Sequence, residues 1–351
     1  MIPAATWPRE RPGDERLLRI DPARGHFTDA RIADLPGLLA PGDLVVVNDA
    51  ATVPASLRAL RDGGTPFEIR LLSHDARDST QRDSTQWTAI LFGRGDWRVR
   101  TEDRPPPPRL DEGERFRVAG GAAARVVAVD RVSPRLVRIA FEGSVASMWA
   151  SIYEEGRPVQ YAYVDAPLAL WHVQSPFASR PWAVELPSAG RPLTSAVRAA
   201  CAARGVPIVA LTHAAGLSSS GDAALDARLP LDERYDLPAP TVDAVERTRA
   251  AGGRIVAAGT TVVRALEGCA GAHGGALVAG EGSTDLRLGP RSRLRVVNGL
   301  LTGIHERGTS HYELVESFVD GRLLGRALEH AGRAGYVQHE FGDTVLVLPG
   351  R

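Results

Sequence analysis

Residues 254–267, RIVAAGTTVVRALE, decide the fold class of this chain. The run RIVAA reads as a buried strand, and Gly259-Thr260-Thr261 leads directly from it into an apolar pattern with helical spacing. A strand followed at once by a helix is the repeating unit of a parallel α/β sheet. The segment therefore predicts an α/β layer with a helix that begins beyond Gly259.

Helical and strand-like patterns alternate on both sides of this unit. Capping residues help to place the boundaries: Thr194 precedes a helix that stops at Gly205, and Ser310 opens the capping-box form S-x-x-E. The predicted strands are 16–20, 44–47, 206–211 and 344–348, and the predicted helices are 29–39, 194–203, 241–251, 310–319 and 322–332. This alternation favours a parallel sheet covered by helices.

The hydrophobicity pattern of the sequence changes between residues 61 and 145. Short, mostly alternating segments follow one another between Gly, Asp and Pro turns: FEIRLL (67–72), WTAILF (87–92), WRVR (97–100), RFRV (115–118), ARVVAV (124–129) and RLVRIAF (135–141). Such spacing is typical of a small all-β barrel or sandwich. We therefore expect an α/β main domain of residues 1–60 and 146–351, interrupted by an inserted all-β domain of residues 61–145. The proline tract 104–109 is expected to be a rigid surface connection.

The amino-acid composition excludes some kinds of catalysis and binding for this chain. The 42 basic residues are all arginine and balance 42 acidic residues. Without lysine, Schiff-base catalysis and a phosphate-loop lysine are excluded. A net charge of zero argues against a chain-wide cationic surface for nucleic acid. A local patch in the β region stays open, as does a simple solvated surface, for Arg98, Arg100, Arg104, Arg109, Arg115 and Arg117.

Cysteine usage and the lack of apolar segments point to a cytoplasmic enzyme without a metal. Cys201 and Cys269 stand alone, with no Cys/His cluster at metal spacing, and are expected to be buried thiols. No stretch approaches the roughly 18 apolar residues of a membrane span. We expect neither a bound metal nor a membrane partner.

The strongest candidate binding site is Gly259-Thr260-Thr261 with Arg264 one turn further on. Free N–H groups at the start of a helix bind carboxylates and phosphates. Alternatively, the threonines only cap the helix, and Arg264 pairs with Glu267 or Asp285. Asn48-Asp49 follows a buried strand, where open α/β sheets bind ligands, although an Asx turn explains the pair equally well.

Three residues are candidates for the general base. His213 and His305 follow apolar runs, and Asp343 precedes the last strand. Any of these side chains can take a proton or orient a substrate. A structural role is the alternative for each of them.

Taken together and in this order, eight segments resemble the S-adenosylmethionine:tRNA ribosyltransferase-isomerase family of queuosine biosynthesis: PGDLVVVNDAATVPASL, VELPSAGRPLT, VALTHAAG, DERYDLP, RIVAAGTTVVRALE, STDLRLGP, VVNGLLTGIH and EFGDTVLVLP. The resemblance implies the same fold, an α/β domain with an inserted small β-barrel. It also implies transfer of the ribosyl part of S-adenosylmethionine, as a substrate, to the aminomethyl group of a 7-deazaguanine base in tRNA. The transferred group closes to an epoxycyclopentanediol, with release of adenine and methionine.

The resemblance also assigns individual residues to the binding of S-adenosylmethionine. The family signature GTTxVRxLE is matched in full by Gly259, Thr260, Thr261, Arg264 and Glu267. Other family segments are matched at Asn48, Asp49 and Pro54, at Pro187, Ala189 and Gly190, at His213 and Ser218, at Glu233 and Tyr235, at Thr302 and His305, and at Gly342 and Asp343. The expected binding residues are Asn48, Asp49, Gly190, Gly259, Thr260, Thr261 and Arg264, and the expected catalytic residues are His213, His305 and Asp343.

Some family positions carry other residues. Ala51 and Ser56 replace two arginines, and Pro192, Arg228 and Leu231 replace histidines. Two alternatives therefore stay open: an enzyme that uses S-adenosylmethionine or a similar nucleoside on a small-molecule acceptor, and a binding protein that has lost the reaction. The missing arginines favour an acceptor other than tRNA, because arginines contact phosphate.

Overall fold

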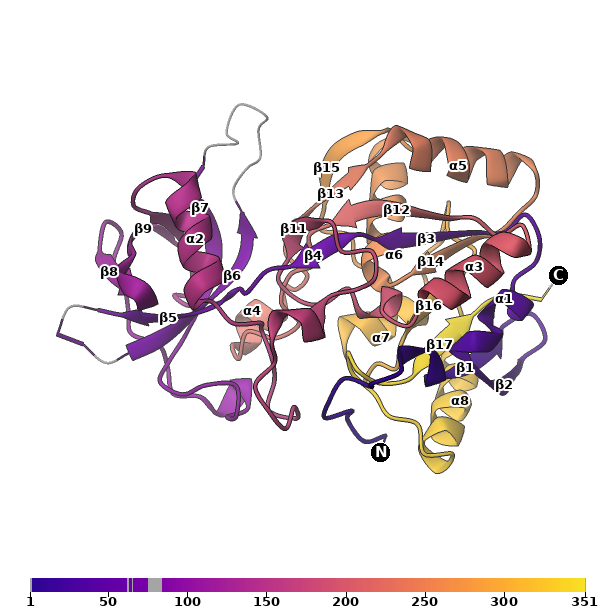
Figure 1. Ribbon diagram of the computed structural model, residues 1–351, viewed down its shortest axis with the longest axis horizontal. Coiled ribbons are helices and arrows are strands. Elements are labelled where there is room, and N and C mark those ends of the chain that lie inside the picture. Colours follow the sequence, from indigo (N-terminus) through magenta and orange to yellow (C-terminus); the bar gives the residue numbers. More distant parts are fainter. Residues whose placement is uncertain (1, 62, 65, 75–83, 351) are drawn as a thin grey trace.

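The computed structural model describes residues 2–61, 63–64, 66–74 and 84–350. Figure 1 shows an α/β body built from both ends of the chain, with a β-barrel beside it. A small two-stranded sheet of β4 (Ala50–Thr52) and β11 (Arg180–Ala183) lies on the α/β side of the connection. The expected fold class, an α/β domain with an inserted β-barrel, is confirmed.

The main domain is built on a nine-stranded sheet in the order β15-β13-β12-β3-β14-β16-β17-β1-β2. Its centre is parallel, since β3 pairs with both β12 and β14, and β14 pairs with β16. The sheet as a whole is mixed, because β17 runs antiparallel to β16 and both edges are antiparallel. The strands are β1 (Arg16–Asp21), β2 (His26–Arg31), β3 (Leu44–Asn48), β12 (Ile208–His213), β13 (Glu233–Leu237), β14 (Ile255–Ala258), β15 (Gly280–Thr284), β16 (Gly299–Gly303) and β17 (Thr344–Val347).

Helices cover both faces of this sheet because its central strands are apolar on both sides. In β3, Leu44 and Val46 face one hydrophobic core, and Val45 and Val47 face the other. The first core includes residues of α5 (Ala239–Ala250), α6 (Thr260–Ala272), α7 (Ser310–Val315) and α8 (Gly321–Arg333). The second includes residues of α1 (Leu35–Leu38) and α3 (Ser195–Ala203).

The inserted body is a closed barrel in the order β10-β7-β6-β5-β8-β9. Its strands are β5 (Ser56–Leu60), β6 (Pro66–His74), β7 (Gln86–Phe92), β8 (Arg115–Val118), β9 (Ala123–Val129) and β10 (Leu136–Phe141). The first barrel strand thus precedes residue 61, where the sequence starts the inserted region. We propose residues 56–141 as the inserted domain, with α2 (Val145–Glu155) packing Met148 and Ile152 against its core.

Several local predictions were wrong. Residues 97–100 form turns rather than a strand, and residues 26–31 pair with β1 as β2 before a shortened α1. Helix α7 is capped by Thr309 Oγ1, not by Ser310, and ends at Val315. By contrast, Thr194 caps α3 as predicted, and both cysteines are buried and free.

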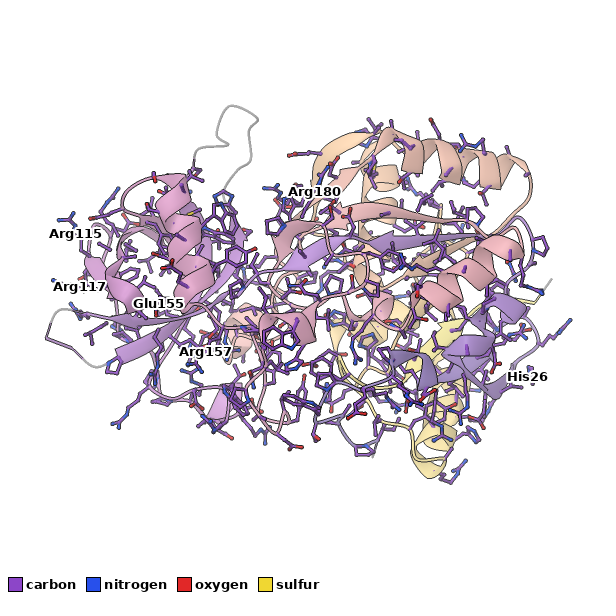
Figure 2. All side chains as sticks on the ribbon, viewed as in Figure 1. His26, Arg115, Arg117, Glu155, Arg157 and Arg180 are labelled. Atoms are coloured by element: carbon purple, nitrogen blue, oxygen red, sulfur yellow. The ribbon has the colours of Figure 1, made fainter. Side chains whose placement is uncertain are left out.

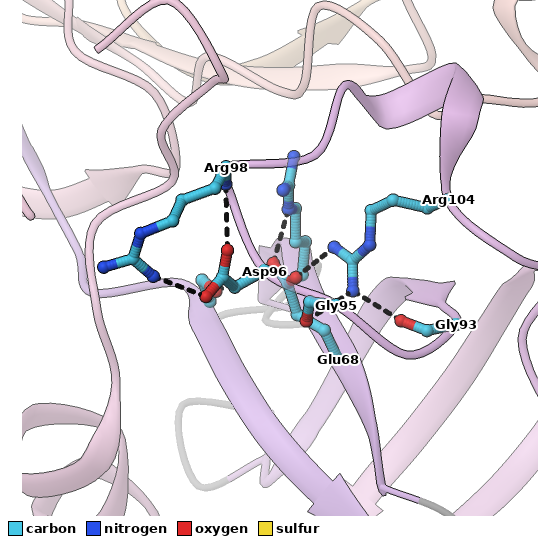
Figure 3. Close-up of polar contacts among 8 residues, drawn as sticks. Glu68, Gly93, Gly95, Asp96, Arg98 and Arg104 are labelled. Atoms are coloured by element: carbon cyan, nitrogen blue, oxygen red, sulfur yellow. Dashed lines mark hydrogen bonds and ion pairs between the residues drawn. The ribbon is translucent and has the colours of Figure 1, made fainter. Parts of the chain in front are cut away.

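Arg104 departs most clearly from its expected place on the surface. It is buried against the outer face of the barrel, where it donates to Glu68 and to the carbonyl oxygens of Gly93 and Gly95 (Figure 3). Glu68 also accepts from Arg70 Nε at 2.6 Å. Burial disfavours the charged carboxylate of Glu68, but Arg70 and Arg104 outweigh burial and lower its pKa. Arg104 therefore anchors the loop between β7 and β8 to strand β6 of the barrel.

The other arginines of the β region do not form one free cationic patch. Arg98 pairs with Asp96, Arg100 with Glu102 and Arg115 with Glu142. Figure 2 shows Arg115 and Arg117 on the side of the barrel remote from the main domain.

Among the described helices, none is both long enough and apolar enough to cross a bilayer.

Candidate active site

A cavity of about 740 Å³ lies where the carboxyl ends of β12, β14 and β16 meet the loops that follow them. The barrel supplies part of its wall through the 3-10 helix Thr101–Asp103 and the preceding Arg100, on the loop that Arg104 anchors. Ligands of open α/β sheets bind at this end of the strands. The cavity is large enough for a nucleoside with a side chain.

The start of α6 lines this cavity, as predicted for Gly259, Thr260 and Thr261. Gly259 has φ 107° and ψ 151°, a conformation that is almost confined to glycine, and its lack of a side chain leaves the helix without a side-chain cap. Thr261 Oγ1 accepts from Asn48 Nδ2 at 3.3 Å, so its own hydroxyl hydrogen is available to a ligand. These threonines do not cap the helix, which favours the anion-site interpretation.

Arg264 also lines the cavity, but its protein partner is neither Glu267 nor Asp285. Its Nη1 donates to Glu233 Oε2 and its Nε donates to the carbonyl oxygen of Leu286 at 3.1 Å. Its Nη2 is buried and has no partner among the described residues. Because the side chain is 9% exposed, a ligand carboxylate that reaches Nη2 would satisfy a buried donor.

Glu233 and His213 lie behind Arg264. Glu233 Oε1 accepts from the Gly216 amide at 2.8 Å, and His213 Nε2 is 3.4 Å from Glu233 Oε2. Burial raises the pKa of Glu233 against the effect of Arg264. Burial and Arg264 hold the pKa of His213 well below its usual range, so the imidazole is neutral. His213 is fully buried and is not among the residues that line the cavity, which favours a positioning role.

Three of the residues expected to bind the ligand do not line the cavity. Asn48 is buried and bridges elements: Nδ2 donates to the His213 carbonyl oxygen at 3.0 Å, and Oδ1 accepts from the His213 and Ala50 amides at 3.0 Å. Asp49 accepts from Thr212 Oγ1 at 2.6 Å. Gly190 ends the short 3-10 helix Ser188–Gly190, whose first two residues do line the cavity. We therefore assign these three residues to positioning.

A group of histidines forms another part of the wall. His305 Nε2 is 2.8 Å from Thr302 Oγ1, and its ring stacks on His311 with centroids 5.1 Å apart. Burial, with His311 and His339 nearby, holds the pKa of His305 well below its usual range. Burial and Arg264 lower the pKa of His311 to about 4. Burial therefore favours the neutral form of both rings and makes each a weaker base than an exposed histidine.

Asp343, the third predicted catalytic residue, lies outside the cavity lining. Its carboxylate accepts from Arg9 Nη2 at 2.6 Å and from the amides of Arg16 and Val337. It therefore fastens the N-terminal segment to the start of β17. These contacts, together with its place outside the cavity lining, favour a structural role for Asp343 over the predicted catalytic one.

The sequence analysis missed several cavity residues that come from distant segments. These are Tyr161, Tyr163, Glu185, His311, His339 and Glu340. Glu185 and Glu340 had a nearby signal, since they lie in the quoted segments VELPSAGRPLT and EFGDTVLVLP. No group of three or more His, Cys, Asp or Glu side chains in the described parts of the chain is arranged to hold a metal ion.

Comparison with known proteins agrees with this arrangement. Residues 3–347 match the model of a family described as queuosine biosynthesis protein. The S-adenosylmethionine:tRNA ribosyltransferase-isomerase of Gloeobacter violaceus is 33% identical over 99% of this chain and 92% of its own length. An enzyme of the same name from Thermus thermophilus is 32% identical over 96% of this chain and 94% of its own length.

A solved structure supports the fold. The S-adenosylmethionine tRNA ribosyltransferase of Thermotoga maritima aligns with 99% of this chain and 98% of its own, with a TM-score of 0.52 and 21% identity. At this identity the likeness concerns the fold alone. The family model and the relatives, each matching nearly the whole chain, show that this chain belongs to the queuosine biosynthesis family of S-adenosylmethionine:tRNA ribosyltransferase-isomerases.

Proposed function

We propose that this protein transfers and isomerises the ribosyl group of S-adenosylmethionine onto the aminomethyl group of a 7-deazaguanine base in tRNA. The observation that carries the proposal is the cavity at the start of α6. There the residues of the signature GTTxVRxLE present a helix start without a side-chain cap and a guanidinium with an unused donor. Curated relatives of the same length carry this activity in their names.

The methionine carboxylate of the donor is the anion that best fits this end of the cavity. It would accept from the first N–H groups of α6, from the Thr261 hydroxyl and from Arg264 Nη2. Asn48 fixes the Thr261 hydroxyl, and Glu233 fixes the guanidinium. Both therefore act through the residues that touch the ligand.

His305 is the general base that we propose among the three candidates. The positive sulfonium makes its neighbouring C5′ protons acidic, so removal of one proton starts the reaction without a metal. His305 lines the cavity and is neutral, and the Thr302 hydroxyl holds its Nε2. When Nε2 accepts from Thr302, Nδ1 carries the hydrogen, so proton transfer at Nε2 requires the threonine to move aside or relay the proton.

The replacement of two family arginines favoured a small-molecule acceptor, and the structure explains one of these replacements, Ser56. Ser56 Oγ donates to Glu68 Oε1 at 2.8 Å, inside the network that Arg70 and Arg104 neutralise. A family arginine at this position would face Glu68 rather than an RNA phosphate. Its replacement by serine therefore does not argue against tRNA as the acceptor.

The test is product formation on defined acceptors. The protein is incubated with S-adenosylmethionine and tRNA carrying the aminomethyl-deazaguanine base, and the epoxycyclopentanediol nucleoside and free adenine are measured by mass spectrometry. Equal amounts of both products support the proposal. Adenine release that also occurs with the free aminomethyl base but gives no tRNA product would indicate a small-molecule acceptor. Absence of both products with a folded, donor-binding protein would refute catalysis.

A further inference from the structure

A second group of polar side chains in the cavity comes from residues outside the signature segment. Tyr161 donates its hydroxyl to Glu185 Oε1, and Tyr163 donates its hydroxyl to Glu340 Oε2. Ser218 also donates two hydrogen bonds to Glu185, from its amide to Oε1 at 3.0 Å and from its hydroxyl to Oε2 at 2.6 Å. All five residues line the cavity, and they come from four segments of the chain. Two carboxylates are thus held in place by neutral donors. Within the described parts of the chain neither forms an ion pair with an arginine, although Arg191 acts at longer range to lower the pKa of Glu340.

Flat rings accompany these carboxylates. Tyr163 stacks on His339 with centroids 4.3 Å apart and an angle of 12° between the rings, and Tyr161 lies 6.0 Å from Tyr163 at 18°. The Arg70 guanidinium lies 5.6 Å from the centroid of the Tyr161 ring, which Tyr163 also faces. The stack therefore ties the cavity wall to strand β6 of the barrel. The faces of Tyr161 and Tyr163 are covered within this stack, so the two carboxylates, rather than the ring faces, would hold a bound organic cation.

Charge in the whole cavity points the same way. The carboxylates among its lining residues are Glu102, Glu185, Glu233, Glu306, Glu313 and Glu340, and the guanidiniums are Arg100, Arg264 and Arg287. Glu102 pairs with Arg100 and Glu233 with Arg264. Burial raises the pKa of Glu340 against the opposing hydrogen bond from Tyr163, so a cation beside it would offset the cost of its charge.

We infer that Glu185 and Glu340, held by Tyr161 and Tyr163, form a binding subsite for an organic cation in this cavity. This inference rests on the proposed function for its two candidate occupants, the sulfonium of the donor and the ammonium of the acceptor's aminomethyl group. Both are alkyl cations that carboxylates attract. With the ammonium bound, Glu340 can take one of its protons, which leaves a neutral amine with a free electron pair and a neutral carboxylic acid.

The first arm measures donor binding by calorimetry and needs no turnover. S-adenosylmethionine is compared with S-adenosylhomocysteine, a neutral thioether that lacks only the methyl group and the charge. If the sulfonium occupies the subsite, Glu340→Gln and Glu185→Gln each weaken S-adenosylmethionine binding about 5- to 30-fold, the range for a desolvated cation contact. Binding of S-adenosylhomocysteine then stays within twofold. Glu329→Gln, which removes an exposed carboxylate on α8, is the matched control.

The second arm measures steady-state kinetics with tRNA carrying the aminomethyl-deazaguanine base. If the ammonium occupies the subsite, the donor selectivity of both variants is unchanged, KM for this tRNA rises about 5- to 30-fold, and the acid limb of the pH profile shifts. Tyr163→Phe keeps the carboxylate and is expected to give a smaller change of the same kind, which provides a second test if a glutamine variant fails to fold. Unchanged donor selectivity and unchanged KM in folded variants would overturn the inference. A wild-type protein that selects the sulfonium through Glu340 but modifies no tRNA would refute the proposed function and leave the subsite standing.

Discussion

Replacing Arg104 with methionine should destabilise the barrel more than any surface arginine replacement on the same loop. The Arg104 side chain is fully buried and donates to Glu68, Gly93 and Gly95. Methionine fills much of the same volume but leaves two backbone carbonyl groups without this donor, and it leaves Glu68 with one arginine instead of two. Breaking a buried ion pair from one side costs about 3–5 kcal/mol.

The assay is thermal unfolding followed by tryptophan fluorescence, because Trp87 is buried in the barrel core. At roughly 2–4 °C for each kcal/mol, the thermal midpoint should fall by roughly 6–20 °C. Arg98→Met is the control: Arg98 is on the same loop, but the side chains of Arg98 and its partner Asp96 are 61% and 44% exposed. Exposed pairs contribute about 0–1 kcal/mol. Equal stabilities of the two variants would refute the anchoring role of Arg104.

Three further changes test other parts of the structure. Glu15→Gln should flatten the decline of stability with rising pH. Burial raises the pKa of Glu15 to about 7, although Thr344, Arg191 and Arg9 act to lower it. The neutral acid therefore stabilises the fold below its unfolded pKa near 4.5, and this stabilisation is lost as the pH rises through 7. Urea unfolding at pH 5 and pH 8 measures this, and an unchanged pH dependence contradicts it. Gly259→Ala should cost about 1–3 kcal/mol because alanine is strained at φ 107°, and it should weaken donor binding measured by calorimetry; wild-type stability would show that the backbone relaxes without penalty. Thr261→Ala combined with Arg264→Gln should weaken S-adenosylmethionine binding by about 1–3 kcal/mol through lost charge-assisted hydrogen bonds, and unchanged affinity in the folded double variant would show that the carboxylate binds elsewhere.

Local sequence determined the building blocks of this protein. The unit of β14 and α6 follows from one short segment, because an apolar run and a glycine before a helical pattern specify strand, turn and helix without distant partners. The barrel strands show the same independence, since alternation of apolar and polar residues reflects one buried face. The resemblance to a known family singled out Arg264 and His305, and both line the cavity.

Tertiary structure alone decided which polar side chains share the cavity. Tyr163, Glu185 and Glu340 are far apart in sequence. Although two of them lie in segments that resemble the family, no local pattern shows that they share a cavity, because a hydrogen bond between distant loops leaves no periodic trace. Asp343 and Arg104 are the opposite case, in which the tertiary structure gives a residue another role than its local sequence suggests. Each looked available for chemistry or for the surface, yet the fold surrounds each with partners from other segments and uses its charge to hold the chain together. Burial and pairing depend on what the remaining chain brings to a position, and this information lies in the topology rather than in the neighbouring residues.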